Sequence, residues 1–219
     1  MLTPDTEAAL SAIVAAADAP FAIEGNGSKH AMLRPVQAAA TISTRGLTGI
    51  TLHRPTELII SARAGTPVAD VEAALATKGQ MLIAEPPSFT GIFGERVPTI
   101  GGAVAAGISG PRRITGGAMR DHVMGVRFVN GMGEVLRSGG RVLKNVTGLD
   151  LCKLLTGSHG TLGIITEVTL KVLPRPEATA TLAVTVADFA AGQRALSAGL
   201  SAPYGVSGAA LVGNRALLR

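Results

Sequence analysis

Residues 21–30 read FAIEGNGSKH, a short apolar strand that runs into a loop with two closely spaced glycines. Glycines at this spacing let successive backbone N–H groups converge on one anion. Ser28 adds a hydroxyl donor and Lys29 a positive charge, so the loop suits a pyrophosphate; a flexible β-turn is the alternative. The pattern is not a Rossmann fingerprint, which needs a third glycine, nor a P-loop, which needs Gly-Lys followed by Ser or Thr.

Three more glycine-rich segments follow, PTIGGAVAAGISG (98–110), GGAMRDHV (116–123) and GSHGTLGIIT (157–166). The first lets a flat ring lie close, or it forms a tightly packed helix of small residues. In the second, Arg120 and Asp121 either face a ligand or orient the loop as an ion pair. Backbone groups of the third can bond a heterocycle. Its Ser-His pair lacks the third member of a hydrolytic triad, and the four histidines have no metal-ligand spacing, so we expect no metal site.

The segments between these motifs alternate strands with helices. Strands are predicted at residues 21–24, 39–43, 50–53, 58–62, 81–84, 123–129, 134–137 and 163–173, and helices at residues 6–17 and 67–78. Residues 85–117 form a long stretch rich in small and turn-forming residues, and loops of that length are usually functional. Residues 130–133, Asn-Gly-Met-Gly, predict a hairpin turn.

Pro174 and Pro176 mark a boundary in the chain. Beyond it, residues 179–186, 188–200 and 206–212 predict a strand, a helix and a strand that open a further domain. So short a piece makes a poor independent core. We therefore expect domains at 1–176, subdivided near residue 60, and at 177–219, with the chain a fragment or shortened form that lacks the rest of the second domain.

The composition excludes several classes of protein. With 47% hydrophobic and 16% charged residues, the chain is not disordered. Its net charge of +5 comes from the basic segment 112–144, but one tyrosine and no tryptophan leave few stacking platforms for nucleic acid, so no nucleic-acid partner is expected. The single cysteine, Cys152, excludes an internal disulfide. Neither a secretory signal nor a membrane-spanning helix is predicted, so we expect a soluble intracellular protein.

Taken in order, the four motifs resemble the FAD-binding domain of the vanillyl-alcohol oxidase/PCMH flavoprotein family. The resemblance covers residues 1–176 and is carried furthest by residues 109–113, 142–150 and 160–163. It implies an α+β fold of two subdomains that clasp FAD between them. It also implies a set of cofactor-binding residues: Gly25, Asn26, Gly27, Ser28, Lys29, His30, Pro86, Pro87, Thr99, Gly101, Gly102, Ser109, Gly110, Gly117, Ala118, Arg120, Asp121, Gly160, Gly163, Ile164 and Ile165.

The sequence departs from the family pattern in three places. Covalent relatives carry His where this chain has Ser28, so we expect FAD to be held non-covalently. Glu24 stands where many relatives have Arg, which weakens the attraction for pyrophosphate. The cap domain that supplies substrate contacts in this family is only begun at residues 177–219, as the start of a truncated α+β unit. No residue is identified as a catalytic base.

The resemblance implies an oxidoreductase subunit of a complex that oxidises glycolate, a small 2-hydroxy acid. In such a complex a hydride passes from the substrate carbon to flavin N5, or the subunit relays electrons. The implied partners are a sister flavoprotein subunit and an iron–sulfur subunit, in the cytoplasm or attached peripherally to the inner membrane through the complex. The alternatives are a stand-alone FAD-dependent oxidase or dehydrogenase of another hydroxy acid or alcohol, and a flavin-free scaffold subunit.

Overall fold

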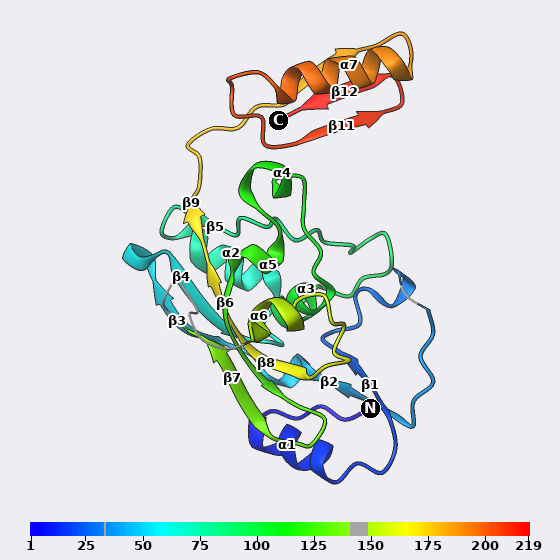
Figure 1. Cartoon of the computed structure of the whole chain (residues 1–219), viewed down its shortest axis with the longest axis vertical. Helices are drawn as coiled ribbons and strands as arrows, with labels where there is room; N and C mark the ends of the chain where they lie inside the picture. Colours follow the sequence, from blue (N-terminus) through cyan, green and yellow to red (C-terminus); the bar gives the residue numbers. More distant parts are fainter. Residues whose placement is uncertain (33, 141–148) are drawn as a thin grey trace.

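A computed structural model describes residues 1–32, 34–140 and 149–219. The chain is a mixed α+β protein with a small N-terminal sheet, a large five-stranded sheet and a C-terminal sheet (Figure 1). The small sheet pairs β1 (Phe21–Glu24) with β2 (Ala40–Ser43) in parallel, and Leu2 adds a parallel bridge to Ile42. The helix α1 (Glu7–Ala15) begins at Thr6, whose side chain accepts from the amide of Ala9. The buried side chains of Leu10, Val14 and Ile42 then join α1 to this sheet.

The large sheet has five antiparallel strands in the order β3-β4-β8-β6-β7. They are β3 (Ile50–Arg54), β4 (Ile59–Arg63), β6 (Val123–Val129), β7 (Val135–Gly139) and β8 (Ile164–Lys171). The central strand β8 buries Val168 and Leu170 and leaves Glu167 and Thr169 partly exposed, which is the alternation expected of a strand with one face in the core.

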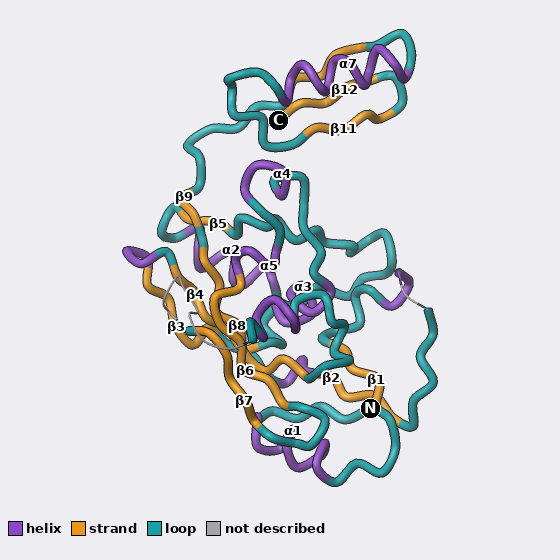
Figure 2. Tube along the Cα trace, in the orientation of Figure 1, coloured by secondary structure: helices purple, strands orange, loops and turns teal. Residues whose placement is uncertain are grey.

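Helices cover one face of the large sheet (Figure 2). They are α2 (Val68–Ala76), α3 (Ile100–Ala106), α5 (Met119–His122) and α6 (Leu151–Leu155), and α4 (Arg113–Gly116) lies beyond them. Short 3-10 turns occur at His30–Met32, Thr44–Gly46 and Pro55–Glu57, and β5 (Gln80–Met81) pairs with β9 (Leu173–Pro174). Within the described residues, no helix is both long enough and apolar enough to cross a membrane.

The C-terminal segment forms a separate small sheet with one helix packed on it. Its strands are β10 (Leu182–Thr185), β11 (Ala209–Val212) and β12 (Arg215–Leu218), antiparallel in the order β10-β12-β11, and its helix is α7 (Phe189–Leu200). Its last residue contacts the first part of the chain, because the Arg219 guanidinium lies 2.7 Å from a carboxylate oxygen of Glu85. The division of the chain into domains at residue 176 stays a prediction.

The structure differs from the sequence-based expectation in three places. The stretch 85–117 is not all loop, since α3 and α4 lie within it. The small residues of α3 form a packed helix, which Thr99 begins by accepting from the Gly102 amide. The strand expected at 81–84 is limited to Gln80–Met81. The third difference concerns the subdivision expected near residue 60. The chain passes from the small sheet to the large one earlier, between β2 and β3. No change of sheet occurs near residue 60, because β3 and β4 pair there.

The two sheets meet where the segment 64–66 crosses three other segments. The Gly65 amide donates to Leu47 O at 2.7 Å, and the Ala64 amide donates to Thr166 O in β8 at 2.8 Å. On the other side, Ala64 O and Thr66 O accept from the first amides of α3, each at 2.8 Å. A β-carbon on Gly65 would lie 2.2 Å from the Thr44 carbonyl oxygen, so only glycine fits this crossing.

We predict that Gly65→Ala destabilises the protein by about 1–3 kcal/mol, because the added methyl group must push backbone away. Gly131→Ala is the control, since a β-carbon at Gly131 meets nothing within 4 Å. Urea unfolding of both variants checks the prediction. Equal stability of the two variants would show that the crossing is not tightly packed.

A charged contact also ties α1 to the large sheet. The Glu7 carboxylate accepts from Arg127 of β6 and from the Thr166 hydroxyl of β8, the latter at 2.6 Å. Burial raises the pKa of Glu7, but the hydrogen bonds from Arg127 and Thr166 outweigh it and hold the pKa below its ordinary value. Glu7 therefore contributes stability above its unfolded-state pKa, and this stability is lost as the pH falls through the folded-state pKa.

We predict that Glu7→Gln lowers the free energy of unfolding at pH 7 by about 1 kcal/mol, because the charged hydrogen bonds are weakened. The difference between wild type and variant should shrink as the pH falls below the ordinary Glu pKa of 4.5. Urea titrations across this pH range measure it. A difference that is independent of pH would contradict the role assigned to the ionised carboxylate.

Candidate functional site

The site is a hollow between the small sheet and α3, about 690 Å³ with its open mouth included. Four parts of the chain line it: the end of β1 with the loop 25–30, Thr44 after β2, the inner face of α3, and the segment that leads into β8. The lining residues are Ile23, Glu24, Gly25, Asn26, Gly27, Ser28, Lys29, His30, Thr44, Thr99, Gly101, Gly102, Ala105, Ala106, His159, Gly160, Ile164 and Ile165.

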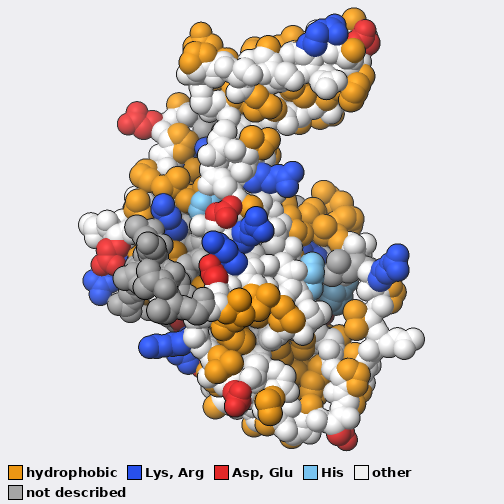
Figure 3. Space-filling model, viewed as in Figure 1, with side chains coloured by type: hydrophobic (Ala, Val, Ile, Leu, Met, Phe, Trp, Pro, Cys, Tyr) orange, Lys and Arg blue, Asp and Glu red, His pale blue; other side chains and the backbone are white. Residues whose placement is uncertain are grey.

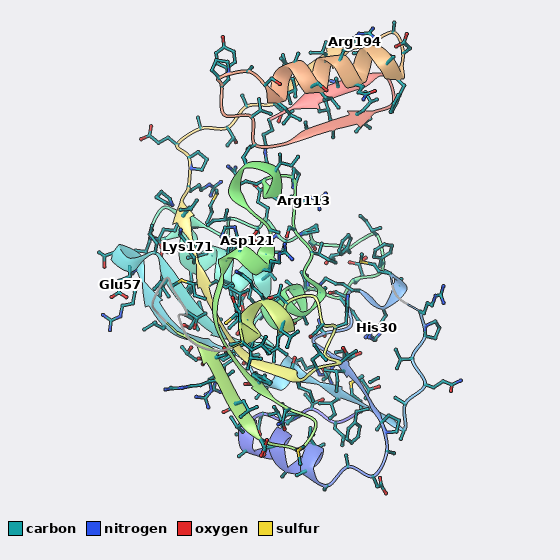
Figure 4. The ribbon with its side chains drawn as sticks, viewed as in Figure 1. His30, Glu57, Arg113, Asp121, Lys171 and Arg194 are labelled. Atoms are coloured by element: carbon teal, nitrogen blue, oxygen red, sulfur yellow. The ribbon has the colours of Figure 1, made fainter. Side chains whose placement is uncertain are left out.

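Twelve of the twenty-one predicted cofactor-binding residues therefore line one hollow. They are Gly25 to His30, Thr99, Gly101, Gly102, Gly160, Ile164 and Ile165. Figure 4 labels His30, the first residue of the 3-10 turn His30–Met32, at one flank of the molecule. Figure 3 shows histidine side chains, in pale blue, on this same flank.

The loop 25–30 presents a row of free amides. Among the described residues, no hydrogen bond uses the backbone N–H of residues 25–29 as donor. The adjacent carbonyls are held, because Ser43 Oγ donates to Gly25 O and Thr44 Oγ1 donates to Glu24 O. Gly27 has a φ of +68°, a left-handed conformation that favours glycine. The loop thus has its carbonyls anchored and its donors available, which is the arrangement of an anion-binding loop.

Charge at the loop comes from side chains of both signs. Burial lowers the pKa of Lys29, and no ion pair among the described residues includes this ammonium group. Glu24 has a side chain only 5% exposed, and its Oε2 lies 2.8 Å from Nε2 of the exposed His30, although the contact lacks hydrogen-bond geometry. An unpaired, partly buried ammonium group is a ready partner for an anionic ligand.

The opposite wall is apolar and has little side-chain bulk. It consists of Gly101, Gly102, Ala105 and Ala106 of α3 together with the start of β8. His159 also lines the hollow, and its amide donates to Ala105 O at 2.9 Å. Its φ of +53° is uncommon for a residue other than glycine, and such conformations often occur at functional sites. A wall without side-chain bulk lets a planar ring lie against it.

Nine predicted residues do not line the hollow: Pro86, Pro87, Ser109, Gly110, Gly117, Ala118, Arg120, Asp121 and Gly163. Several of them make structural contacts. Ser109 Oγ accepts from the Met119 amide at 2.8 Å, and the Asp121 carboxylate accepts from the Ala118 amide at 2.8 Å. Arg120 lies 4.0 Å from Asp121, which fits the alternative that this pair orients its loop. Arg141, Lys144 and the motif positions 142–148 lie outside the described residues.

Sequence reasoning did not include six lining residues in the site: Ile23, Glu24, Thr44, Ala105, Ala106 and His159. Five of them lie within the quoted motif segments, so taking every residue of those segments as a candidate would have found them. Thr44 carries no sequence signal. It reaches the site because β2 pairs in parallel with β1 and both strands end at the same edge.

The residues present fit a flavin dinucleotide. The free amides and Lys29 match a pyrophosphate, and the apolar wall formed by α3 and β8 matches a ring system. The fold and the site thus define a flavin-binding α+β domain. Residues 1–139 match the family model described as "FAD binding domain", and the chain belongs to this family. FAD is therefore its cofactor, and the predictions of the PCMH-type family, of its α+β fold and of FAD are confirmed.

The chain is similar to named members of oxidoreductase complexes. It is 49% identical over 163 residues to glycolate oxidase subunit GlcE of Escherichia coli K12, a match that covers 74% of this chain and 45% of that protein. It is 34% identical over 140 residues to glycolate oxidase subunit GlcD of Bacillus subtilis 168, covering 64% of this chain and 28% of that protein. The chain thus spans less than half the length of these relatives.

A solved structure of alkyldihydroxyacetonephosphate synthase has the same fold. It superposes with a TM-score of 0.74 and 25% sequence identity, over 91% of this chain and 36% of that one. This relationship extends the fold likeness beyond residues 1–139 into the C-terminal part of the chain.

We predict that Lys29→Met weakens FAD binding about tenfold or more, because a charge-assisted contact to phosphate is lost. The unliganded variant should be at least as stable as wild type, since burial disfavours the charged ammonium group. Fluorescence titration with FAD and thermal unfolding measure the two effects. Lys78→Met, at an exposed position after α2, is the matched control and should change neither. A parallel loss of stability and affinity would show that Lys29 is structural.

Proposed function

We propose that the chain is the FAD-holding part of a subunit in a complex that oxidises glycolate. The observation that carries the proposal is the row of free amides at residues 25–29, facing an apolar wall across one hollow. The named relatives support the choice of glycolate, since both are subunits of glycolate oxidase. The membership of an FAD-binding family supports an oxidoreductase activity, and oxidation of a CH–OH group is the part that we propose.

Different residues of the hollow would bind different parts of the cofactor. The amides of residues 25–29 and the Lys29 ammonium would bind the pyrophosphate, while Thr99, Gly101 and Gly102 would lie along the ribityl chain and the ring. Bound FAD supplies the hydride-accepting N5 of the flavin. Ala105, Ala106, Ile164 and Ile165 would exclude water from one side of the ring. Ser28 offers no ring nitrogen for a covalent link, so we propose that FAD is bound non-covalently.

The remaining proposals concern the assembly. The two relatives bear the names of different subunits of glycolate oxidase, which supports an oligomeric complex with a sister flavoprotein subunit. An iron–sulfur subunit would take the electrons onward. We place the complex in the cytoplasm or peripherally at the inner membrane. In this arrangement the chain either receives the hydride directly or relays electrons between partners.

We predict that the purified chain, incubated with FAD and desalted, keeps flavin absorption that denaturation releases into solution. With partner subunits present and oxygen excluded, glycolate should then bleach that absorption, because hydride transfer reduces the flavin. Acetate, which lacks the hydroxyl group, is the control substrate and should leave the spectrum unchanged.

Each outcome of this experiment separates the alternatives. Bleaching by another hydroxy acid but not by glycolate would show that the proposed substrate is wrong, while the proposed FAD site would stand. Bleaching by glycolate without any partner subunit would favour a stand-alone dehydrogenase. Absence of bound flavin, even after reconstitution, would favour a flavin-free scaffold.

A further inference from the structure

A cation from a distant segment lies at the loop 25–30. A β-carbon built on Gly27 would lie 2.3 Å from Nη1 of Arg96, 3.0 Å from Cε1 of His30 and 3.3 Å from Oε2 of Glu24. The Arg96 guanidinium therefore occupies the space directly over Gly27, in the middle of the row of free amides. Sequence reasoning did not include Arg96 among the site residues.

The segment that carries Arg96 is a self-contained strap, residues 86–97. The Gly91 amide donates to Gly94 O at 3.0 Å, and the rings of Phe89 and Phe93 pack with centroids 5.3 Å apart. A side-chain hydrogen bond ties the strap to the loop 25–30, from Asn26 Nδ2 to Val97 O at 3.1 Å. The backbone next to Arg96 is therefore held against the anion-binding loop, and Arg96 is delivered there by the strap.

The hydrogen-bond donors of the Arg96 guanidinium are available to a ligand. Among the described residues, Arg96 takes part in no ion pair, and its side chain makes no hydrogen bond. A guanidinium presents five N–H donors in a planar fork that matches phosphate oxygens. This group is exposed, so a ligand in the mouth of the hollow can reach it.

The local charge balance shows why such a group is needed. The buried Glu24 carboxylate repels a dianion, and the Lys29 ammonium offsets only that one negative charge. These two groups together leave the loop without net positive charge. Arg96 makes the loop net positive, which the binding of a pyrophosphate requires.

We propose that Arg96 is a phosphate-binding residue of the FAD site, delivered by the strap 86–97 to offset the buried carboxylate of Glu24. The proposal rests on the placement of the pyrophosphate at residues 25–29. It assigns the strap to cofactor retention, and it makes FAD affinity depend on a residue that lies almost 70 positions from the loop along the chain.

The test compares FAD with riboflavin, which has the same ring system but no phosphate. Arg96→Met should weaken FAD binding about 10- to 100-fold and leave riboflavin binding unchanged, because only the phosphate contact is lost. Arg96→Lys should lose less affinity for FAD than Arg96→Met, since lysine keeps the positive charge but not the planar fork of donors. Arg194→Met, in the distant helix α7, is the matched control and should behave as wild type (Figure 4).

A second pair of variants tests the charge balance. Glu24→Gln should tighten FAD binding, and it should recover part of the affinity lost in Arg96→Met. Inorganic pyrophosphate should compete with FAD on wild type and compete less well on Arg96→Met, which provides a readout that needs no flavin activity.

The outcomes that overturn the proposal are distinct from failure of the FAD site. Unchanged FAD affinity in Arg96→Met, or an equal loss for FAD and riboflavin, would overturn the role of Arg96 while leaving the site in place. Binding of FAD by wild type without competition from pyrophosphate would overturn the placement of the phosphates. A wild type that binds no FAD would overturn both the site and the proposal.

Discussion

The backbone crossing at residues 64–66 is the constraint on which the rest of the structure depends. Four backbone hydrogen bonds of 2.7–2.8 Å bind this short segment to Leu47, which follows the small sheet, to β8 and to the first turn of α3. Gly65 and Gly101 both lie where a β-carbon would clash, at 2.2 Å from Thr44 O and 2.4 Å from Ala64 Cβ. At both positions backbone lies where a side chain would be, and the contact of Gly101 with Ala64 fixes where α3 lies.

The hollow is a consequence of that crossing. With α3 held by its first turn, its small inner residues face the end of β1, and the parallel pairing of β1 with β2 brings Thr44 to the same edge. The amides of the loop 25–30 find no carbonyl partner there among the described residues, because Ser43 and Thr44 hold the loop by its own carbonyls instead. The hollow therefore has unused donors on one side and an apolar wall on the other, which is the arrangement that the proposed cofactor site uses.

Local signals in the sequence predict much of this structure. The features that they do not predict are decided by contacts between segments far apart in the chain. The alternation along residues 163–173 and the Gly25 to Lys29 loop are encoded within a few neighbouring residues, and both lie where they were predicted. For residues 98–110, which contain α3, the sequence leaves two alternatives open. A run of glycines and alanines packs as a helix only when other parts of the chain, here Ala64 and β8, provide the surface. The positions of Thr44 at the hollow and of Arg96 beside Gly27 come from contacts across the chain that leave no local pattern.

Gly110, one of the nine predicted residues that do not line the hollow, shows one thing that a glycine motif indicates. Gly110 packs against the carbonyl oxygen of Glu85, and the Gly110 amide donates to Ala84 O at 2.7 Å, so the close approach is real but the neighbour is the protein itself. Glu85 has a left-handed φ of +45° and is held by Arg112 and Arg219, which fixes the residue from which the strap 86–97 departs. A glycine motif therefore predicts that something lies close to the backbone. Only the three-dimensional arrangement shows whether that neighbour is a cofactor or the frame that positions one.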